Sequence, residues 1–193
     1  MADYSDQFLE AFNSAMLYEV GPHWDPTDPD VISGTIDTQE QRRKVGYTNI
    51  TGDSGGVTKY GIAQNSHPEL SVRDLDLNNA MGVYQQSYWN KSHCDSLPYP
   101  STIFYFDCCV NLGLGRGAKM LQQSLGVTVD GQIGPGTIEA ANQQDQNQLI
   151  ESLSKNRTDF YNSIVERNPS QEKFLVGWLR RVDEVTATTI SKI

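Results

Sequence analysis

A stripe of apolar residues near the start of the chain predicts a helix over residues 5–19; its members are Phe8, Phe12, Ala15 and Met16. Ser5 or Asp6 is the expected N-cap. Counting three residues on from the last apolar member reaches Glu19, and Gly21 then ends the helix. An acid therefore stands in line with the apolar stripe, at a position where a leucine would stabilise the fold.

The remaining pattern is mostly helical. Six further helices are expected: about 78–90, the apolar run IFYFDCCVNLGLG after Pro100, 116–125, 135–143 and two stretches at roughly 146–166 and 171–189. Residues 22–56 differ, because they are rich in Asp, Thr, Gly and Pro and contain only short β-branched pieces. We interpret them as loops with a small hairpin region. The predicted fold class is mainly α, with one small β-hairpin region in the N-terminal half.

Composition limits the possible partners. A chain of 193 residues with 37% hydrophobic residues can form one domain, or two small ones in contact. A net charge of −9 and a pI near 4.7 argue against a nucleic-acid binder and against a helix that lies on a membrane surface. Three cysteines, two of them adjacent, favour a reducing compartment over a disulfide framework. We find no leader pattern and no apolar run long enough to span a bilayer.

Few residues offer catalytic chemistry. The three histidines are isolated and their spacing does not resemble a metal site, so we predict no metal and no cofactor. The cysteines lie in an apolar helix and are expected to be buried small hydrophobes. Carboxylates remain, and Glu19 has two interpretations. It is either a solvated acid at a helix end or a carboxyl group in partly apolar surroundings that stays protonated and donates a proton to a leaving oxygen.

The run GDSGGVTKYGIAQ, residues 52–64, is the second candidate. Gly55 and Gly56 permit a tight turn, and the alternation around Thr58 is typical of a short strand. An ordinary hairpin with a polar edge would explain these features. Alternatively, Asp53 and Thr58 face Glu19 across a cleft and position an attacking water.

Together these segments resemble the endolysins of glycoside hydrolase family 108, which are N-acetylmuramidases. The resemblance rests on a helix that ends in Glu, an Asp-Pro pair, and the run D-x-G-G-x-T-x-Y-G-I. Residues 106–142 look like the peptidoglycan-binding segment that accompanies that family, and FLVGWLRRV, residues 174–182, resembles its closing motif. The junction YWNKSHCDSLP, residues 88–98, is similar as well, so the likeness spans roughly residues 8–183.

The resemblance implies a lysozyme-like α+β fold and places the family's catalytic acid at Glu19. Asp53 and Thr58 are the further catalytic candidates that it implies. We predict that Tyr60, Asp25 and Asn111 bind substrate; Asp25 also competes with Asp53 as the second carboxylate, because about 25 residues separate Asp25-Pro26 from the D-x-G-G run. This insertion, at about 27–52, is expected to form an added hairpin or a mobile lip. Val20 stands where the family has glycine.

The run DGQIGPGT, residues 130–137, is expected to be architectural, since Asp-Gly is a turn signal and Pro prepares a helix start. Arg116 and Lys119 are either solvated or within reach of an anionic part of the wall polymer. We expect a catalytic region at 1–94 and a peptidoglycan-binding-type region at 95–193 packed on it, which could together form one compact domain.

The predicted function is hydrolysis of the bond from N-acetylmuramic acid to N-acetylglucosamine in peptidoglycan. The alternatives are a lytic transglycosylase, or a non-catalytic wall-binding or virion protein. We expect a monomer that accumulates in the host cytoplasm until lysis and then acts in the periplasm or cell wall. The resemblance also implies dependence on a holin-type membrane permeabiliser. Neither a nucleic acid nor direct insertion into the membrane is expected.

Overall fold

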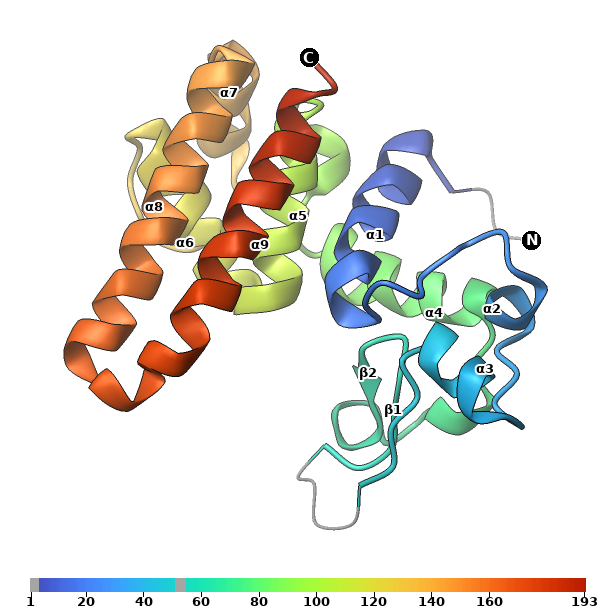
Figure 1. The fold of residues 1–193 in the computed structure, drawn as a ribbon. Coiled ribbons are helices and arrows are strands. Elements are labelled where there is room, and N and C mark those ends of the chain that lie inside the picture. Colours follow the sequence, from blue (N-terminus) through green and yellow to red (C-terminus); the bar gives the residue numbers. More distant parts are fainter. Residues whose placement is uncertain (1–3, 51–54) are drawn as a thin grey trace. The chain divides into compact units, whose positions relative to one another are not determined.

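The computed structural model describes residues 4–50 and 55–193. The chain forms two compact units, unit 1 up to Gln86 and unit 2 from Ser87 to Ile193, and each is described by itself. The predicted boundary after residue 94 lies within unit 2. Across the described residues, none of the helices has the length and apolar character needed to cross a membrane. The fold is mainly helical with a two-stranded antiparallel hairpin in the N-terminal half, as predicted (Figure 1).

Unit 1 is built on helix α1 (Asp6–Glu19). The hydroxyl of Ser5 accepts a hydrogen bond from the Phe8 amide at 3.2 Å, which confirms a predicted N-cap and the predicted helix. The apolar stripe is buried, and the ring of Phe12 meets the rings of Trp24 and Tyr84 edge to face, at 5.8 and 5.3 Å between centroids. These contacts fix the end of α1 in the core of unit 1.

The predicted hairpin is wrong for the described part of the insertion, whereas the alternative of a mobile lip stays a prediction. The segment contains two short helices, α2 (Pro29–Ser33) and α3 (Gln39–Lys44). Asp28 caps α2 ahead of a proline at the first helical position, and Thr38 with Gln41 forms a capping box on α3. These caps favour helix strongly enough to override the β-branched residues nearby. Lys44 then joins the two helices by ion pairs to Asp28 and Asp30 at 2.8 and 2.9 Å.

The hairpin follows, with β1 (Thr58–Lys59) antiparallel to β2 (Ile62–Ala63). Short 3₁₀ turns η1 (Gln64–Ser66) and η2 (Val72–Asp74) lead to helix α4 (Leu77–Tyr84). The predicted helix over 78–90 is therefore only partly α-helical, because a π-helical stretch, η3 (Gln85–Trp89), replaces its second half.

Unit 2 contains the remaining helices: η4 (Cys94–Ser96), α5 (Ser101–Leu112), α6 (Leu114–Leu125), α7 (Pro135–Gln143), α8 (Gln146–Arg167), η5 (Pro169–Gln171) and α9 (Glu172–Ile190). Residues 101–109 of α5 are all buried, as expected of a helix that is apolar on every side. Helices α8 and α9 pack side by side and are joined by η5 (Figure 1). The helices predicted in this half are confirmed.

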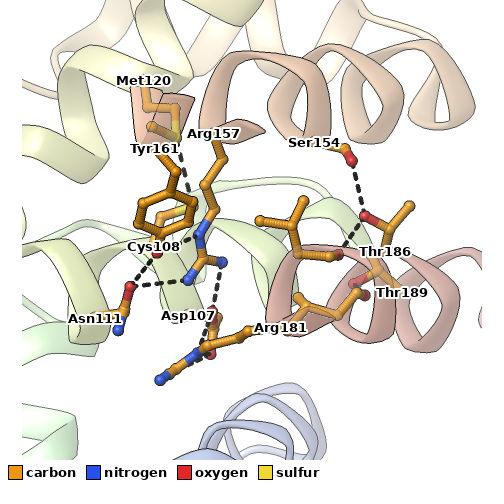
Figure 2. A network of polar contacts seen from close by, with 12 residues as sticks. Asp107, Cys108, Asn111, Met120, Ser154, Arg157, Tyr161, Arg181, Thr186 and Thr189 are labelled. Atoms are coloured by element: carbon orange, nitrogen blue, oxygen red, sulfur yellow. Dashed lines mark hydrogen bonds and ion pairs between the residues drawn. The ribbon is translucent and has the colours of Figure 1, made fainter. Parts of the chain in front are cut away.

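A buried ionic network joins three helices of unit 2 (Figure 2). The carboxylate of Asp107 on α5 meets Arg157 of α8 at 2.6 Å and Arg181 of α9 at 2.8 Å. The Arg157 guanidinium also donates to the side-chain oxygen of Asn111 at 3.1 Å. Burial by itself would raise the pKa of Asp107, but the two guanidinium groups lower it, so the carboxylate stays charged. The network makes the helix arrangement depend on one carboxylate.

Candidate functional site

Glu19 is the last residue of α1 and its side chain is half-buried. Its methylene groups pack against Gly61 in the hairpin turn. A Cβ added to Gly61 would lie 2.8 Å from Cβ of Glu19 and 2.6 Å from the hydroxyl oxygen of Tyr84. Real Cβ atoms do not approach that closely, so glycine at 61 is required for Glu19 to occupy this place.

The turn itself has an unusual residue in its first position. Lys59 pairs with Ile62, and the two residues between them, Tyr60 and Gly61, have φ angles of 52° and 73°. Two positive φ values in a two-residue loop are those of a type I′ turn, which ordinarily has Asn or Gly in the first position. A left-handed conformation costs a residue with a Cβ roughly 1–2 kcal/mol.

Contacts on both sides of Tyr60 offset this cost. Its hydroxyl donates to the carbonyl of Val31 at 2.5 Å, and its amide donates to the carbonyl of Val45 at 2.8 Å. Its own carbonyl accepts from the hydroxyl of Tyr84 at 2.9 Å. The side chain is fully buried, and burial raises its pKa, so the phenol stays neutral. Three segments thus hold the turn that supports Glu19.

A buried lysine braces the same hairpin. The ammonium group of Lys59 donates to the carbonyls of Gly34 and Arg73 at 2.6 and 2.8 Å, although the residue is only 1% exposed. Burial lowers its pKa. Gly34 has a φ of 70°, and a Cβ there would lie 2.2 Å from the carbonyl oxygen of Leu75. The hairpin, the end of α2 and η2 are therefore fixed together.

The structure explains Val20, which stands where the resembling family has glycine. Val20 caps α1 with φ of −104° and ψ of −39°, a conformation open to any residue. The left-handed position is taken by the next residue, Gly21, with φ of 101°. Gly46 lies close on the other side, where a Cβ would be 3.3 Å from the Cα of Val20. A glycine at position 20 is not needed to end this helix.

For the other two predicted catalytic residues, Asp53 and Thr58, the structure gives less information. Asp53 lies outside the described residues. Thr58 begins β1, pairs with Ala63, and exchanges two backbone hydrogen bonds of 2.9 Å with Thr48. Its strand position agrees with the predicted hairpin. The expected water-positioning role of Thr58 stays a prediction.

The three predicted substrate-binding residues lie in three different environments. The exposed carboxylate of Asp25 accepts hydrogen bonds from the amide and hydroxyl of Thr27, at 2.9 and 2.7 Å, and these bonds lower its pKa. Tyr60 is in the core, where it supports Glu19 and has no exposed surface to offer a ligand. Asn111 accepts from Tyr161 at 2.6 Å as part of the Asp107 network. The structure does not show these three residues as one site.

The run DGQIGPGT has the architectural role that was expected. The buried side chain of Gln122 donates to Asp130 at 2.7 Å and accepts from the amide of Gly131 at 2.7 Å. Pro135 then begins α7. Arg116 stacks over the ring of Phe160 at 4.8 Å, which gives this arginine a structural contact of its own.

The residues that position Glu19, Gly61 and Tyr84, are not among the site residues predicted from the sequence. One local feature of the sequence did point to this turn: Tyr60-Gly61 fits a two-residue hairpin loop between two short strand-like segments. No group of three potential metal ligands among His, Cys, Asp and Glu occurs in the described ranges. The three cysteines are buried as predicted, and burial raises the pKa of Cys94 to about 12 and that of Cys108 to about 11.

Comparison with known proteins gives two adjoining family matches. Residues 41–113 match the family model "Glycosyl hydrolase 108", and residues 116–183 match "Predicted Peptidoglycan domain". The first match begins after Glu19. A solved structure, "Structure of Brucella abortus SagA", is similar with a TM-score of 0.64 and 28% identity, covering 76% of this chain and 86% of that one. No match was found among the curated proteins. The chain therefore joins a segment similar to glycosyl hydrolase 108, which identifies it as a glycoside hydrolase, to a segment similar to the predicted peptidoglycan domain.

Proposed function

We propose that this glycoside hydrolase cleaves the bond from N-acetylmuramic acid to N-acetylglucosamine in peptidoglycan, with Glu19 as the general acid. The observation that carries the proposal is the placement of Glu19. Glu19 is the last residue of a core helix, and its side chain packs against a hairpin turn in which Tyr60 has a strained, left-handed backbone conformation. The choice of peptidoglycan as the substrate is supported by the adjoining match to the predicted peptidoglycan domain.

The chemistry follows from the carboxyl group. Glu19 protonates the glycosidic oxygen while an oxocarbenium-like transition state develops on the sugar. A second carboxylate, Asp53 or Asp25, orients the attacking water together with Thr58. In an inverting enzyme the two carboxyl groups stand roughly 6.5–9.5 Å apart to admit that water. The proton donor and the water-orienting acid therefore come from different segments of the chain.

Product analysis tests this reaction. Purified protein is incubated with peptidoglycan, and the soluble fragments are identified by mass spectrometry. Hydrolysis predicts fragments that end in reducing N-acetylmuramic acid. Fragments with anhydromuramyl ends would instead identify a lytic transglycosylase, which also uses one glutamate but no water. Binding of peptidoglycan without any released fragment would identify a wall-binding protein.

The proposal extends to an endolysin that is made in the cytoplasm of a phage host and released to the wall by a membrane permeabiliser. It rests on the resemblance of the D-x-G-G-x-T-x-Y-G-I run and the accompanying second half to such enzymes. Expression in a bacterial host, alone and with a permeabilising protein, tests it. Lysis is expected only with the permeabiliser, and lysis by the protein alone would contradict this part.

A further inference from the structure

Lys59 is a buried cation of unit 1 that the proposed reaction does not use. Its side chain leaves strand β1 and the residue is 1% exposed. Asp74, Asp76 and Arg73 act on the ammonium group electrostatically, but no carboxylate of the described residues forms an ion pair with it. A cation that leaves water without a paired carboxylate is costly. The position of this lysine in the core therefore needs another explanation.

Backbone carbonyl groups take the place of a carboxylate. The ammonium group donates to the carbonyl of Gly34 at 2.6 Å and to that of Arg73 at 2.8 Å. Gly34 is the C-cap of α2, and Arg73 belongs to η2. Carbonyl groups at the end of a helix have no donor within that helix. An apolar side chain at position 59 would remove this donor from both carbonyls, so the lysine links β1 to two other segments in a way that a leucine could not.

The same residue closes the hairpin loop. Lys59 pairs with Ile62 across the two-residue loop Tyr60-Gly61. Its ammonium group also lies 5.7 Å from the centre of the Tyr60 ring. The hydroxyl of Tyr60 donates to the carbonyl of Val31, which like Gly34 belongs to the α2 segment. Two consecutive residues of the hairpin are therefore bonded to the same short helix and its cap.

The loop in turn limits where Glu19 can lie. A Cβ on Gly61 would be 2.8 Å from Cβ of Glu19, so the loop and the acid are in direct contact. The left-handed backbone of Tyr60 is a conformation that its surroundings have to impose. A loop released from α2 and η2 would relax toward ordinary φ values, and the acid that packs on it would move as well. A small displacement of a catalytic group is enough to slow a reaction.

We propose that Lys59 is a positioning residue for the acid: its ammonium group holds the Tyr60-Gly61 loop in the left-handed conformation on which Glu19 packs. The residue acts through the loop and touches neither the substrate nor the reacting atoms. The consequence for the reaction rests on the proposed function of Glu19, whereas the effect on the loop rests on the hydrogen bonds of Lys59. A lysine that only added stability would leave the rate of the folded molecules unchanged.

Amide hydrogen exchange, followed by NMR, tests the effect on the loop without any substrate. Lys59→Met removes the donor and keeps the length of the side chain. The amide of Tyr60, which donates to the carbonyl of Val45, is expected to exchange about tenfold faster in this variant, relative to the amides of α1. An equal acceleration throughout unit 1 would show a general loss of stability and would overturn the proposal.

A second variant keeps the test decisive if Lys59→Met does not fold. Lys59→Gln retains a donor on a shorter side chain, which reaches the two carbonyls less well. A smaller acceleration at the Tyr60 amide, again relative to α1, is expected. Exchange at this amide that equals the wild-type rate in a folded Lys59→Gln protein would contradict the role of Lys59.

Kinetics on soluble, uncrosslinked glycan strands test the effect on the acid. In Lys59→Met, kcat is expected to fall about tenfold while KM stays within about twofold, because the substrate contacts remain and the acid is displaced. Lys44→Met is the matched control, since Lys44 pairs with Asp28 and Asp30 and not with the hairpin, and should keep the kcat of the wild type. Equal falls in kcat, or a change in KM alone, would overturn the proposal. If the wild type itself releases no fragments, the proposed function fails, and hydrogen exchange still decides the role of Lys59.

Discussion

The side chain of Glu19 packs on Gly61 with no space for a methyl group between them, since a Cβ on residue 61 would lie 2.8 Å from Cβ of Glu19. This contact joins the end of the first helix to a hairpin turn that starts about forty residues later. The turn residue before Gly61 is a strained, fully buried tyrosine. Glu19 is therefore held by the core of unit 1.

We predict that Gly61→Ala lowers both activity and stability. The added methyl collides with Glu19 and Tyr84, and the φ of 73° disfavours any side chain, so a loss of about 1–3 kcal/mol in unfolding free energy is expected. Peptidoglycan hydrolysis should fall at least tenfold, because a small displacement of the acid is costly. Gly82→Ala in α4 is the matched control. Its nearest contact would be 3.7 Å away, and alanine in a helix should leave activity intact and stability equal or higher.

Tyr84→Phe is predicted to weaken the support of the turn. It removes the donor to the carbonyl of Tyr60, a buried acceptor, at a cost of about 1–3 kcal/mol in unfolding free energy. Denaturation in urea measures this cost, and hydrolysis should slow in parallel. Tyr4→Phe serves as the comparison, because its hydroxyl donates to the carbonyl of Asn78 in a part-buried setting. Equal losses in the two variants would contradict a special role for Tyr84.

Asp107→Asn should strongly destabilise unit 2. The variant removes the carboxylate that pairs with the buried Arg157 and with the nearly buried Arg181, and breaking a buried pair costs about 3–5 kcal/mol. Thermal denaturation followed by circular dichroism measures it. Asp159→Asn removes an exposed carboxylate that pairs with Lys155, and should cost less than about 0.5 kcal/mol. A loss of that small size in Asp107→Asn would show that the network contributes little.

The same carboxylate predicts how stability depends on pH. The pKa of Asp107 is lower in the folded protein than its ordinary value of 3.8. Its contribution to stability is therefore complete above that ordinary value and is lost as the pH falls through the lower folded value. Unfolding free energies of wild type and Asp107→Asn, measured from neutral pH downward, should differ by a constant amount and converge only below pH 3.8. A difference that disappears already between pH 7 and 5 would contradict the lowered pKa.

A comparison of Asp53→Asn with Asp25→Asn identifies which of the two aspartates is the second catalytic carboxylate. Asp25 accepts two hydrogen bonds from Thr27, which is sufficient reason for an aspartate there, so its replacement should affect the loop more than the reaction. We predict the larger loss of hydrolysis rate in Asp53→Asn. Initial rates on peptidoglycan decide between them, and a larger loss in Asp25→Asn would reverse the assignment.

Helices were predictable from the sequence because their apolar spacing and caps are local. The stripe that begins with Phe8 predicted α1 and its Ser5 cap, and the apolar run after Pro100 predicted the buried helix α5. Helices α2 and α3 were not predicted, because they are short and lie in a segment rich in Asp, Thr, Gly and Pro; the Asp28-Pro29 pair and the Thr38 capping box are the local signals that favour them.

Site geometry was less predictable, because it depends on contacts between distant segments. The spacing of Glu19 on its stripe was a local signal and was found. Tyr60, in contrast, was assigned to substrate binding, whereas its burial follows from partners at Val31, Val45 and Tyr84 that periodicity does not reveal.

The most direct test of the account is the activity of Glu19→Gln. Glutamine keeps the shape of the side chain and its packing on Gly61 but has no acidic proton to donate. We predict that the variant folds with the melting temperature of the wild type and releases almost no fragments from peptidoglycan, while the wild type releases fragments with reducing N-acetylmuramic ends. Full activity of the folded variant would contradict the assignment of Glu19 as the general acid.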